Sequence, residues 1–236
     1  MKESLKVDAL RGTALFRGLD NADIAAAIRA AGAFETDYAK GDIVWDQDSA
    51  VQNAAIVKAG ILLCMRYAAS GHNQLLHAYS AGATVNVEAV ASRKGISPTN
   101  AAMSTDGTII WIPYRELVDG PGLRKAVQAS IKENAAYYLA DEAIRGMKKN
   151  CILSRHTTQD RILAFFNNMR EKSHDDTFDI EMGHPELASY LCVDRTTLTQ
   201  ALNTMRKNGL IGYRGTVYTI LHPLPKRPDG IGELTI

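Results

Sequence analysis

Residues 182–213 constrain the fold of this chain most strongly, because they predict two short helices joined by a tight turn. The first predicted helix covers 185–191 and the second covers 195–208. Asp194 precedes the second helix as a candidate N-cap, and Gly209 follows it as a stop signal. Apolar residues of the second helix recur at spacings that place them on one buried stripe: Leu198, Ala201, Leu202 and Met205. Such a helix pair is a common way to place a helix in the major groove of duplex DNA.

The opposite face of the second predicted helix carries side chains that can hydrogen-bond to base edges. These side chains are Arg195, Thr196, Thr199, Gln200 and Asn203. Two β-prone runs, 210–213 and 216–220, follow the helix and flank Arg214-Gly215, which predicts a hairpin that turns at this pair. Helix, turn, helix and hairpin together predict a winged helix. A winged helix used only for protein–protein contact is the alternative.

Composition limits the kind of DNA-binding protein that this chain can be. The 236 residues carry a net charge of +1, which argues against nonspecific coating of DNA. Residues 182–214 hold four basic and two acidic side chains, a local charge of only +2. No apolar run is long enough for a membrane span or a signal peptide, and the three cysteines are scattered. We therefore expect a reduced, cytoplasmic protein without a membrane partner.

The first half of the chain predicts an antiparallel β-barrel or jelly roll. Short β-prone runs cover 43–45, 55–57, 61–64, 74–78 and 108–112, with glycines between them. A helix over 22–31 is expected before them, with Asn21 as its candidate cap. A metal-dependent, cupin-like barrel enzyme with an appended winged helix is the alternative. Its ligands would be His72, His77 and Glu88, although strict strand alternation places the two histidines on opposite faces.

Residues 119–154 predict a helical region, in which one long helix over 123–151 would be about 45 Å from end to end at 1.5 Å per residue. Its apolar positions have the spacing of a helix–helix seam: Val127, Ile131, Ala135 and Tyr138. A helix of this length exceeds what one small domain covers, which favours pairing into a parallel homodimer. A long intramolecular connector is the alternative. Gly146 interrupts this helix at a cost of about 1 kcal/mol relative to alanine, which a hinge or a close backbone approach would explain.

With these elements the chain resembles the Crp/Fnr regulators. Besides the winged helix, the matching stretches are LFRGL at 15–19, KGDI at 40–43, IVKAG at 56–60 and ASGH at 69–72. The resemblance implies an α+β chain with a cyclic-nucleotide-binding-like sensor domain at 1–118, a dimerisation helix at 119–153 and a winged helix-turn-helix DNA-binding domain at 154–236. It implies a homodimeric, non-enzymatic transcription regulator that binds an inverted repeat in double-stranded DNA. RNA polymerase is a further candidate partner, and no cofactor is expected.

The resemblance also assigns DNA contacts to individual residues. Arg195 matches an arginine that contacts guanine in the cyclic-AMP receptor, and a bidentate contact supplies about 1–3 kcal/mol of discrimination. Thr196 and Gln200 replace a glutamate and a second arginine, and Gln200 suits adenine better than guanine. The candidate phosphate contacts are His184, Thr197, Thr199 and Arg214. Cys192 stands where the turn usually has glycine, so a left-handed backbone there would cost about 1 kcal/mol.

The expected effector is a small molecule other than cyclic AMP. Cyclic-AMP-binding members hold the phosphate with an Arg-Ser pair, whereas Thr99 or Asn100 stands at the position of that arginine here. Three scattered cysteines also cannot hold an iron–sulfur cluster. The candidate effector-binding residues, which would lie between the barrel and the long helix, are Tyr79, Thr84, Asn86, Tyr137, Tyr138 and Met147.

Overall fold

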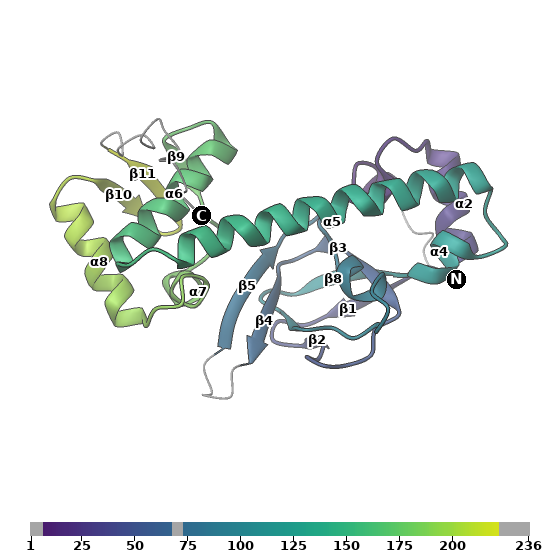
Figure 1. Ribbon diagram of the computed structural model, residues 1–236, viewed down its shortest axis with the longest axis horizontal. Coiled ribbons are helices and arrows are strands. Elements are labelled where there is room, and N and C mark those ends of the chain that lie inside the picture. The colour runs from purple at the N-terminus through teal and green to yellow at the C-terminus, as the bar shows by residue number, and fades with distance from the viewer. Residues whose placement is uncertain (1–6, 68–72, 222–236) are drawn as a thin grey trace, which may run out of the picture. The chain divides into compact units, whose positions relative to one another are not determined.

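The computed structural model describes residues 7–67 and 73–221, and the chain forms two compact units, Met1–Gly146 and Met147–Ile236. The boundary between the units falls inside one continuous helix, α5 (Lys125–Leu153), shown in teal and green in Figure 1. The N-terminal unit combines β-sheets with helices, and the C-terminal unit combines helices with a small sheet. The predicted α+β class is confirmed.

Two antiparallel sheets form a β-sandwich in the N-terminal unit. The strands that the structure describes there are β1 (Phe34–Tyr38), β2 (Ile43–Trp45), β3 (Asn53–Ala59), β4 (Leu62–Tyr67), β5 (Asn73–Tyr79), β6 (Thr84–Val85), β7 (Asn100–Met103) and β8 (Gly107–Pro113). Their order is β1-β8-β3-β6 in one sheet and β2-β7-β4-β5 in the other. The sequence predicted five of these strands. It missed β1, which has two acidic residues among its five, the two-residue β6, and β7, which lacks β-branched residues.

The helices of the N-terminal unit cover the outer face of the β1-β8-β3-β6 sheet. They are α1 (Val7–Leu10), the 3-10 helix η1 (Ala14–Phe16), α2 (Asn21–Ala31), α3 (Val87–Val90) and α4 (Tyr114–Asp119). Alternate residues of the central strands face opposite ways: Ile56 and Ile110 pack against the helices, whereas Val57 and Ile109 lie between the sheets. The N-cap of α2 is Asp20, whose carboxylate accepts from a backbone N–H of the first turn, so the prediction of Asn21 as cap was wrong by one residue.

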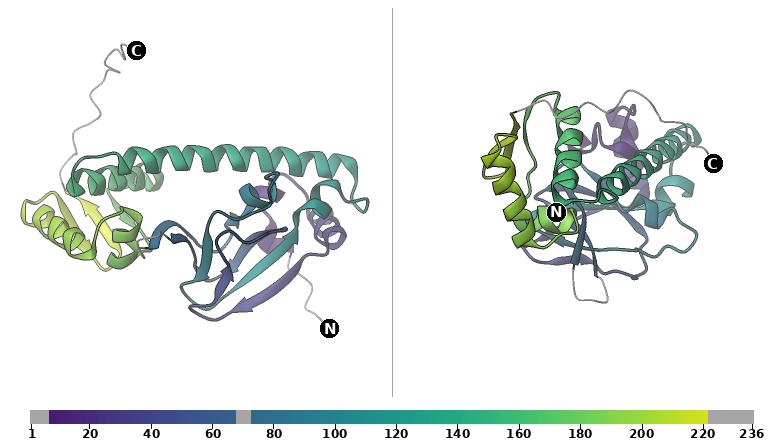
Figure 2. Two further views of the ribbon diagram at one scale, coloured as in Figure 1. Left: turned by 60° about the horizontal axis from the view of Figure 1, so that its bottom comes forward. Right: turned by 60° about the vertical axis from the view of Figure 1, so that its left-hand side comes forward.

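The predicted seam of the long helix is buried inside its own chain. The four seam residues Val127, Ile131, Ala135 and Tyr138 are at most 6% exposed and belong to the core that α2, α4 and the sheet also form. Figure 2 shows this part of α5 lying over the N-terminal strands. The assignment of these four residues to a dimer seam was therefore wrong, because a helical apolar stripe shows that one face is buried but does not show against what.

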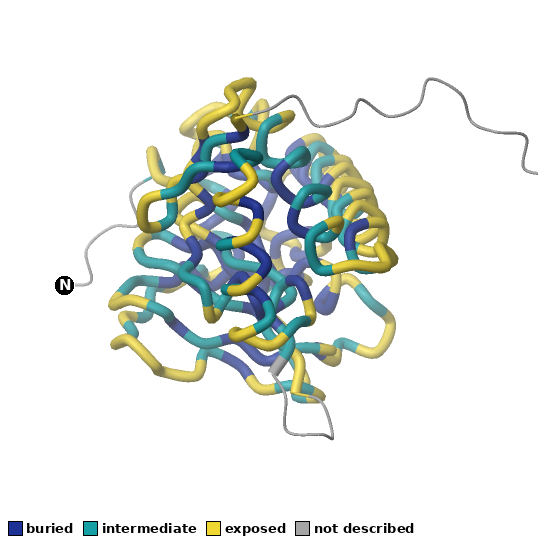
Figure 3. Tube along the Cα trace, turned by 90° about the vertical axis from the view of Figure 1, so that its left-hand side faces the viewer, coloured by how far each residue is buried: buried dark blue, intermediate teal, exposed yellow. Residues whose placement is uncertain are grey.

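The C-terminal unit is a winged helix. It contains α6 (Thr158–Ser173), β9 (Thr177–Asp179), α7 (His184–Tyr190), α8 (Arg195–Lys207), β10 (Ile211–Arg214) and β11 (Val217–Ile220), with the three strands in the order β10-β11-β9. Its core includes Phe166, whose ring centroid lies 4.7 Å from that of Tyr218 and 5.6 Å from that of Phe178. In Figure 3, buried and exposed stretches alternate along the chain, as expected for helices and strands that pack one face against a core.

Two details of the wing differ from the prediction. The hairpin turns at Gly215-Thr216, since Arg214 still pairs with Val217, so the turn lies one residue later than predicted. Gly215 has a φ of +62°, a backbone conformation that glycine adopts without strain. The sequence also missed β9, a strand of three residues with two exposed polar ends.

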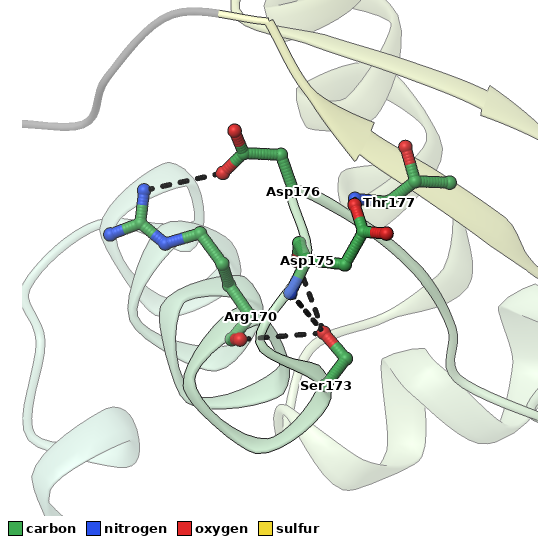
Figure 4. Close-up of polar contacts among 5 residues, drawn as sticks. All are labelled: Arg170, Ser173, Asp175, Asp176 and Thr177. Carbon is green, nitrogen blue, oxygen red and sulfur yellow. Dashed lines mark hydrogen bonds and ion pairs between the residues drawn. The ribbon is translucent and has the colours of Figure 1, made fainter.

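Side-chain contacts fix the route from α6 into β9 (Figure 4). The hydroxyl of Ser173 donates to the backbone carbonyl of Asp175 at 3.0 Å, and the Asp175 carboxylate accepts from the backbone N–H of Thr177 at 2.8 Å. Arg170 and Asp176 form an ion pair at 3.7 Å. These contacts turn the chain sharply at the end of α6 and bring β9 to the edge of the wing.

Candidate nucleic-acid interface

Hydrogen bonds from the Asp194 cap and from Arg161 of α6 stabilise the turn between α7 and α8. Cys192 has a φ of +54°, which confirms the left-handed backbone expected where glycine is usual. The N-cap role of Asp194 is also confirmed: its carboxylate accepts from the backbone N–H of Thr197 at 2.8 Å, and these hydrogen bonds lower the pKa of Asp194. Arg161 of α6, which was not predicted from the sequence, also holds the turn: its guanidinium donates to the carbonyls of Leu191 and Cys192 at 3.3 and 3.4 Å. Turn carbonyls offer no sequence pattern from which such a contact can be predicted.

Helix α8 presents a polar face to solvent. Its buried side consists of the four predicted residues Leu198, Ala201, Leu202 and Met205. Arg195, Thr196 and Gln200 are exposed on the other side. Within residues 7–67 and 73–221, the side chains of Arg195 and Gln200 make no hydrogen bond or ion pair. Both are therefore available to an external partner.

The four candidate phosphate contacts occupy different surroundings. The Thr197 hydroxyl donates to the Asp194 carboxylate, and the Thr199 hydroxyl donates to the Arg195 carbonyl at 2.8 Å. Their protons are thus used inside the helix, and a contact to phosphate would have to replace these bonds. The His184 ring packs edge-on at 5.7 Å from the Tyr213 ring. Arg214 is exposed beside the wing turn.

The structure does not bring all six candidate effector residues together. Tyr79, Thr84, Asn86 and Tyr138 are buried, whereas Tyr137 and Met147 are 63% and 65% exposed. Asn86 has a φ of +67° and donates from its amide to the Asn53 carbonyl at 3.2 Å. It also lines a pocket of about 250 Å³, together with Phe34, Trp45 and Trp111.

Two acidic residues accompany the buried tyrosines. The Tyr138 hydroxyl donates to Glu88 at 3.4 Å, and Arg145 pairs with Glu142 at 2.8 Å while its guanidinium lies 5.9 Å from the Tyr79 ring centroid. Burial raises the pKa of Glu88 and the pKa of Glu142 above the usual range. This group was not predicted from the sequence, since acidic side chains are usually solvated.

The ligand set of the alternative barrel enzyme is incomplete in the described chain, because His72 lies outside the described residues. Across residues 7–67 and 73–221, no group of three His, Cys, Asp or Glu side chains is placed to hold a metal ion. None of the helices in this described part is long and apolar enough to cross a membrane.

Helices α7 and α8, the capped turn between them and the wing form a winged helix-turn-helix domain. Residues 160–223 match the family model of the Crp-like helix-turn-helix domain. No curated protein sequence matches the chain significantly. The match to the family model assigns a Crp-like helix-turn-helix domain to the C-terminal unit.

Solved structures of similar fold extend over most of the chain. The c-di-GMP responsive global regulator CLP of Xanthomonas campestris is 15% identical, with a TM-score of 0.70 over 86% of this chain and 100% of that one. FixK2 of Bradyrhizobium japonicum is 17% identical, with a TM-score of 0.64 over 80% of this chain and 93% of that one. A CooA mutant of Carboxydothermus hydrogenoformans is 16% identical, with a TM-score of 0.67 over 80% of this chain and 84% of that one. At these identities the likeness concerns the fold.

Proposed function

We propose that this protein is a homodimeric regulator that binds an inverted repeat in double-stranded DNA in response to a small molecule other than cyclic AMP. The observation that carries the proposal is the exposed polar face of α8, which a capped turn and a wing hold in a fixed position. In this account 1–118 are the sensor domain, 119–153 the dimerisation helix and 154–236 the DNA-binding domain. RNA polymerase is a candidate further partner.

Base recognition is assigned to the N-terminal half of α8. Arg195 would donate to guanine O6 and N7, Gln200 would pair with adenine N6 and N7, and Thr196 would lie between them. Contacts from His184, Thr197, Thr199 and Arg214 to phosphates would position the helix without specifying sequence.

Dimerisation is assigned to the exposed side of α5. An apolar stripe repeats there at alternating spacings of three and four residues, and all its members are exposed in the single chain: Tyr137, Ala140, Ile144, Met147 and Cys151. This is the spacing of a coiled-coil seam. The stripe lies on a different face of the helix from the four buried residues first predicted. In this arrangement Tyr137 and Met147 would contact a second copy of the chain instead of an effector.

Gly146 lies next to this stripe in the sequence but is not one of its five members. A Cβ atom at Gly146 would meet nothing within 4 Å. We therefore expect Gly146→Ala to stabilise α5 by about 1 kcal/mol, measured as a rise in the midpoint of thermal unfolding. The matched control is Ala143→Gly, at an exposed position of the same helix, which should shift the midpoint in the opposite direction. A lower midpoint for Gly146→Ala would contradict the assignment of this position to an uncrowded surface.

The group around Tyr138 supports an effector without a phosphate. Glu88 and Glu142 place two carboxylates near the buried tyrosines, with Arg145 as their cationic partner. A cyclic nucleotide would bring a further negative charge into this partly buried group, where charge repulsion is only weakly screened. The chemistry of these residues therefore favours a neutral or cationic effector.

The raised pKa of Glu88 has a consequence for stability. Because its pKa is higher in the folded protein than in the unfolded chain, the folded state binds more protons between the two values, and stability falls as pH rises through that window. We expect Glu88→Gln to unfold at a higher temperature than the wild type at pH 7.5, with the difference shrinking at pH 4.5. Glu133→Gln, at an exposed position of α5, should change little at either pH. A lower unfolding temperature for Glu88→Gln at pH 7.5 would show that the ionised carboxylate is stabilising.

Binding of a labelled duplex of mixed sequence tests whether the winged helix binds DNA at all. We expect measurable affinity at 50 mM salt that falls steeply at 200 mM, because phosphate contacts release counterions. Absence of binding at 50 mM salt, with and without a pool of candidate effectors, would favour the alternative in which the domain only contacts proteins.

A further inference from the structure

Asn203 stands on the exposed side of α8, one turn beyond Gln200, but its surroundings differ from those of the base-reading candidates. Two side chains donate to the same oxygen of its amide. The Tyr213 hydroxyl lies 3.3 Å from Oδ1 of Asn203, and Nη2 of Arg206 lies 3.5 Å from the same atom. Within residues 7–67 and 73–221, Nδ2 of Asn203 has no acceptor.

Tyr213 is itself fixed in place. Its ring stacks on Tyr218 with centroids 5.3 Å apart and an interplanar angle of 25°, and the guanidinium of Arg206 lies 5.2 Å from its centroid. Tyr218 is fully buried in the core of the unit. Tyr213 therefore links the core of the winged helix to the amide of Asn203, and it orients Arg206 through a cation–π contact.

An asparagine held in this way cannot read adenine in the usual manner. The bidentate contact to adenine needs Oδ1 to accept from N6 while Nδ2 donates to N7. Here Oδ1 already accepts from two donors, so the amide offers only N–H groups to a partner. The adjacent guanidinium of Arg206 likewise only donates. Two donors side by side, one of them cationic, suit a phosphate oxygen.

We infer that Asn203 and Arg206 form a phosphate clamp on the DNA backbone, and that Tyr213 is the residue that positions it. This inference rests on the proposed function, because it requires the exposed side of α8 to face DNA. It adds a sequence-independent contact beyond the base-reading half of the helix. Such a contact fixes how deeply α8 enters the groove without selecting a base pair.

The clamp is tested by measuring the affinity of protein variants for a selected operator and for the same operator with single base-pair changes. Asn203→Ala should weaken binding about tenfold, by the same factor for every operator variant, since a hydrogen bond to a charged group is lost. Asn203→Asp should weaken it further, because a carboxylate would face the phosphate. Arg206→Ala should lower the slope of log affinity against log salt by about one.

The positioning role of Tyr213 is tested by a double-mutant cycle. Tyr213→Phe keeps the stacked ring and removes only the hydroxyl, and should weaken binding about threefold in the wild type but not in the Asn203→Ala background. Tyr218→Phe is the matched control: it makes the same change in the adjoining ring, whose hydroxyl has no partner in the described chain and does not contact Asn203. It should leave DNA affinity unchanged.

Three outcomes would overturn the clamp while leaving the proposed function intact. One is wild-type affinity for Asn203→Ala. Another is a loss confined to one operator base pair, which would make Asn203 a base-reading residue. The third is a Tyr213→Phe effect of equal size in both backgrounds, which would make the tyrosine merely structural. Failure of the wild-type protein to bind any duplex would instead contradict the proposed function itself.

Discussion

The Arg195→Ala variant is expected to lose preference for its operator while it retains weak, salt-sensitive binding to DNA. Arg195 lies in the first turn of α8, where its side chain is exposed and makes no hydrogen bond or ion pair in the described chain. A bidentate contact between arginine and guanine contributes about 1–3 kcal/mol of discrimination, so specificity should fall by roughly fivefold to 150-fold. Phosphate contacts elsewhere in the domain would be unaffected. Affinities for the operator and for a scrambled duplex, compared at one salt concentration, give the ratio directly.

Lys207→Ala provides the control for this measurement. Lys207 is an exposed basic residue in the last turn of the same helix, so its removal deletes the same charge away from the proposed base contacts. It should weaken binding to both duplexes equally and leave their ratio unchanged. If Arg195→Ala retained the full operator preference, the assignment of Arg195 as a base-contacting residue of α8 would be wrong.

The Ile144→Glu variant is expected to be a folded monomer that binds the operator at least about a hundredfold more weakly than the wild type. Ile144 is 52% exposed at the centre of the apolar stripe on α5. Two copies joined along this stripe would bury a carboxylate at each equivalent position, which is costly without a partner charge. Loss of dimerisation removes the gain from engaging two half-sites at once, which amounts to factors of 10²–10⁴. Sedimentation and operator binding would be measured on the same samples.

Ile43→Glu makes the same chemical change away from the stripe. Ile43 is 55% exposed on β2 of the N-terminal unit, so its exposure matches that of Ile144. This control should remain dimeric and bind the operator normally. A dimeric Ile144→Glu protein with unchanged affinity would show that the stripe is not the dimer interface.

The helix-turn-helix could be predicted in detail because the turn and both ends of α8 have local chemical signals. Asp194 caps α8, Gly209 has a φ of +68° just after the helix ends, and Cys192 takes the left-handed conformation of the turn. Signals of this kind depend on neighbouring residues alone. Contacts between distant residues, such as the hydrogen bonds from Arg161 to the turn, have no equivalent signal and emerged only from the structure.

The faces of α5 show the limit of periodicity. The spacing of Val127, Ile131 and Ala135 correctly indicated a buried face, yet that face packs against the sheet of the same chain. A second stripe, around Ile144, was not singled out because its alanine and cysteine members are weakly hydrophobic. The group around Tyr138 was harder still to predict. The carboxyl groups of Glu88 and Glu142, which accompany the buried Tyr138, come from separate helices, and no spacing in the sequence brings them together.

Selection of the purified protein against a random duplex library, with and without pooled candidate effectors, tests the central claim most directly. We expect enrichment of an inverted repeat whose half-site centres are separated by about one helical turn or a multiple of it. Each half-site should contain a guanine that Arg195 contacts. Enrichment of a single unpaired half-site would contradict the dimeric regulator. The absence of any enriched sequence under every condition would contradict sequence-specific DNA binding itself.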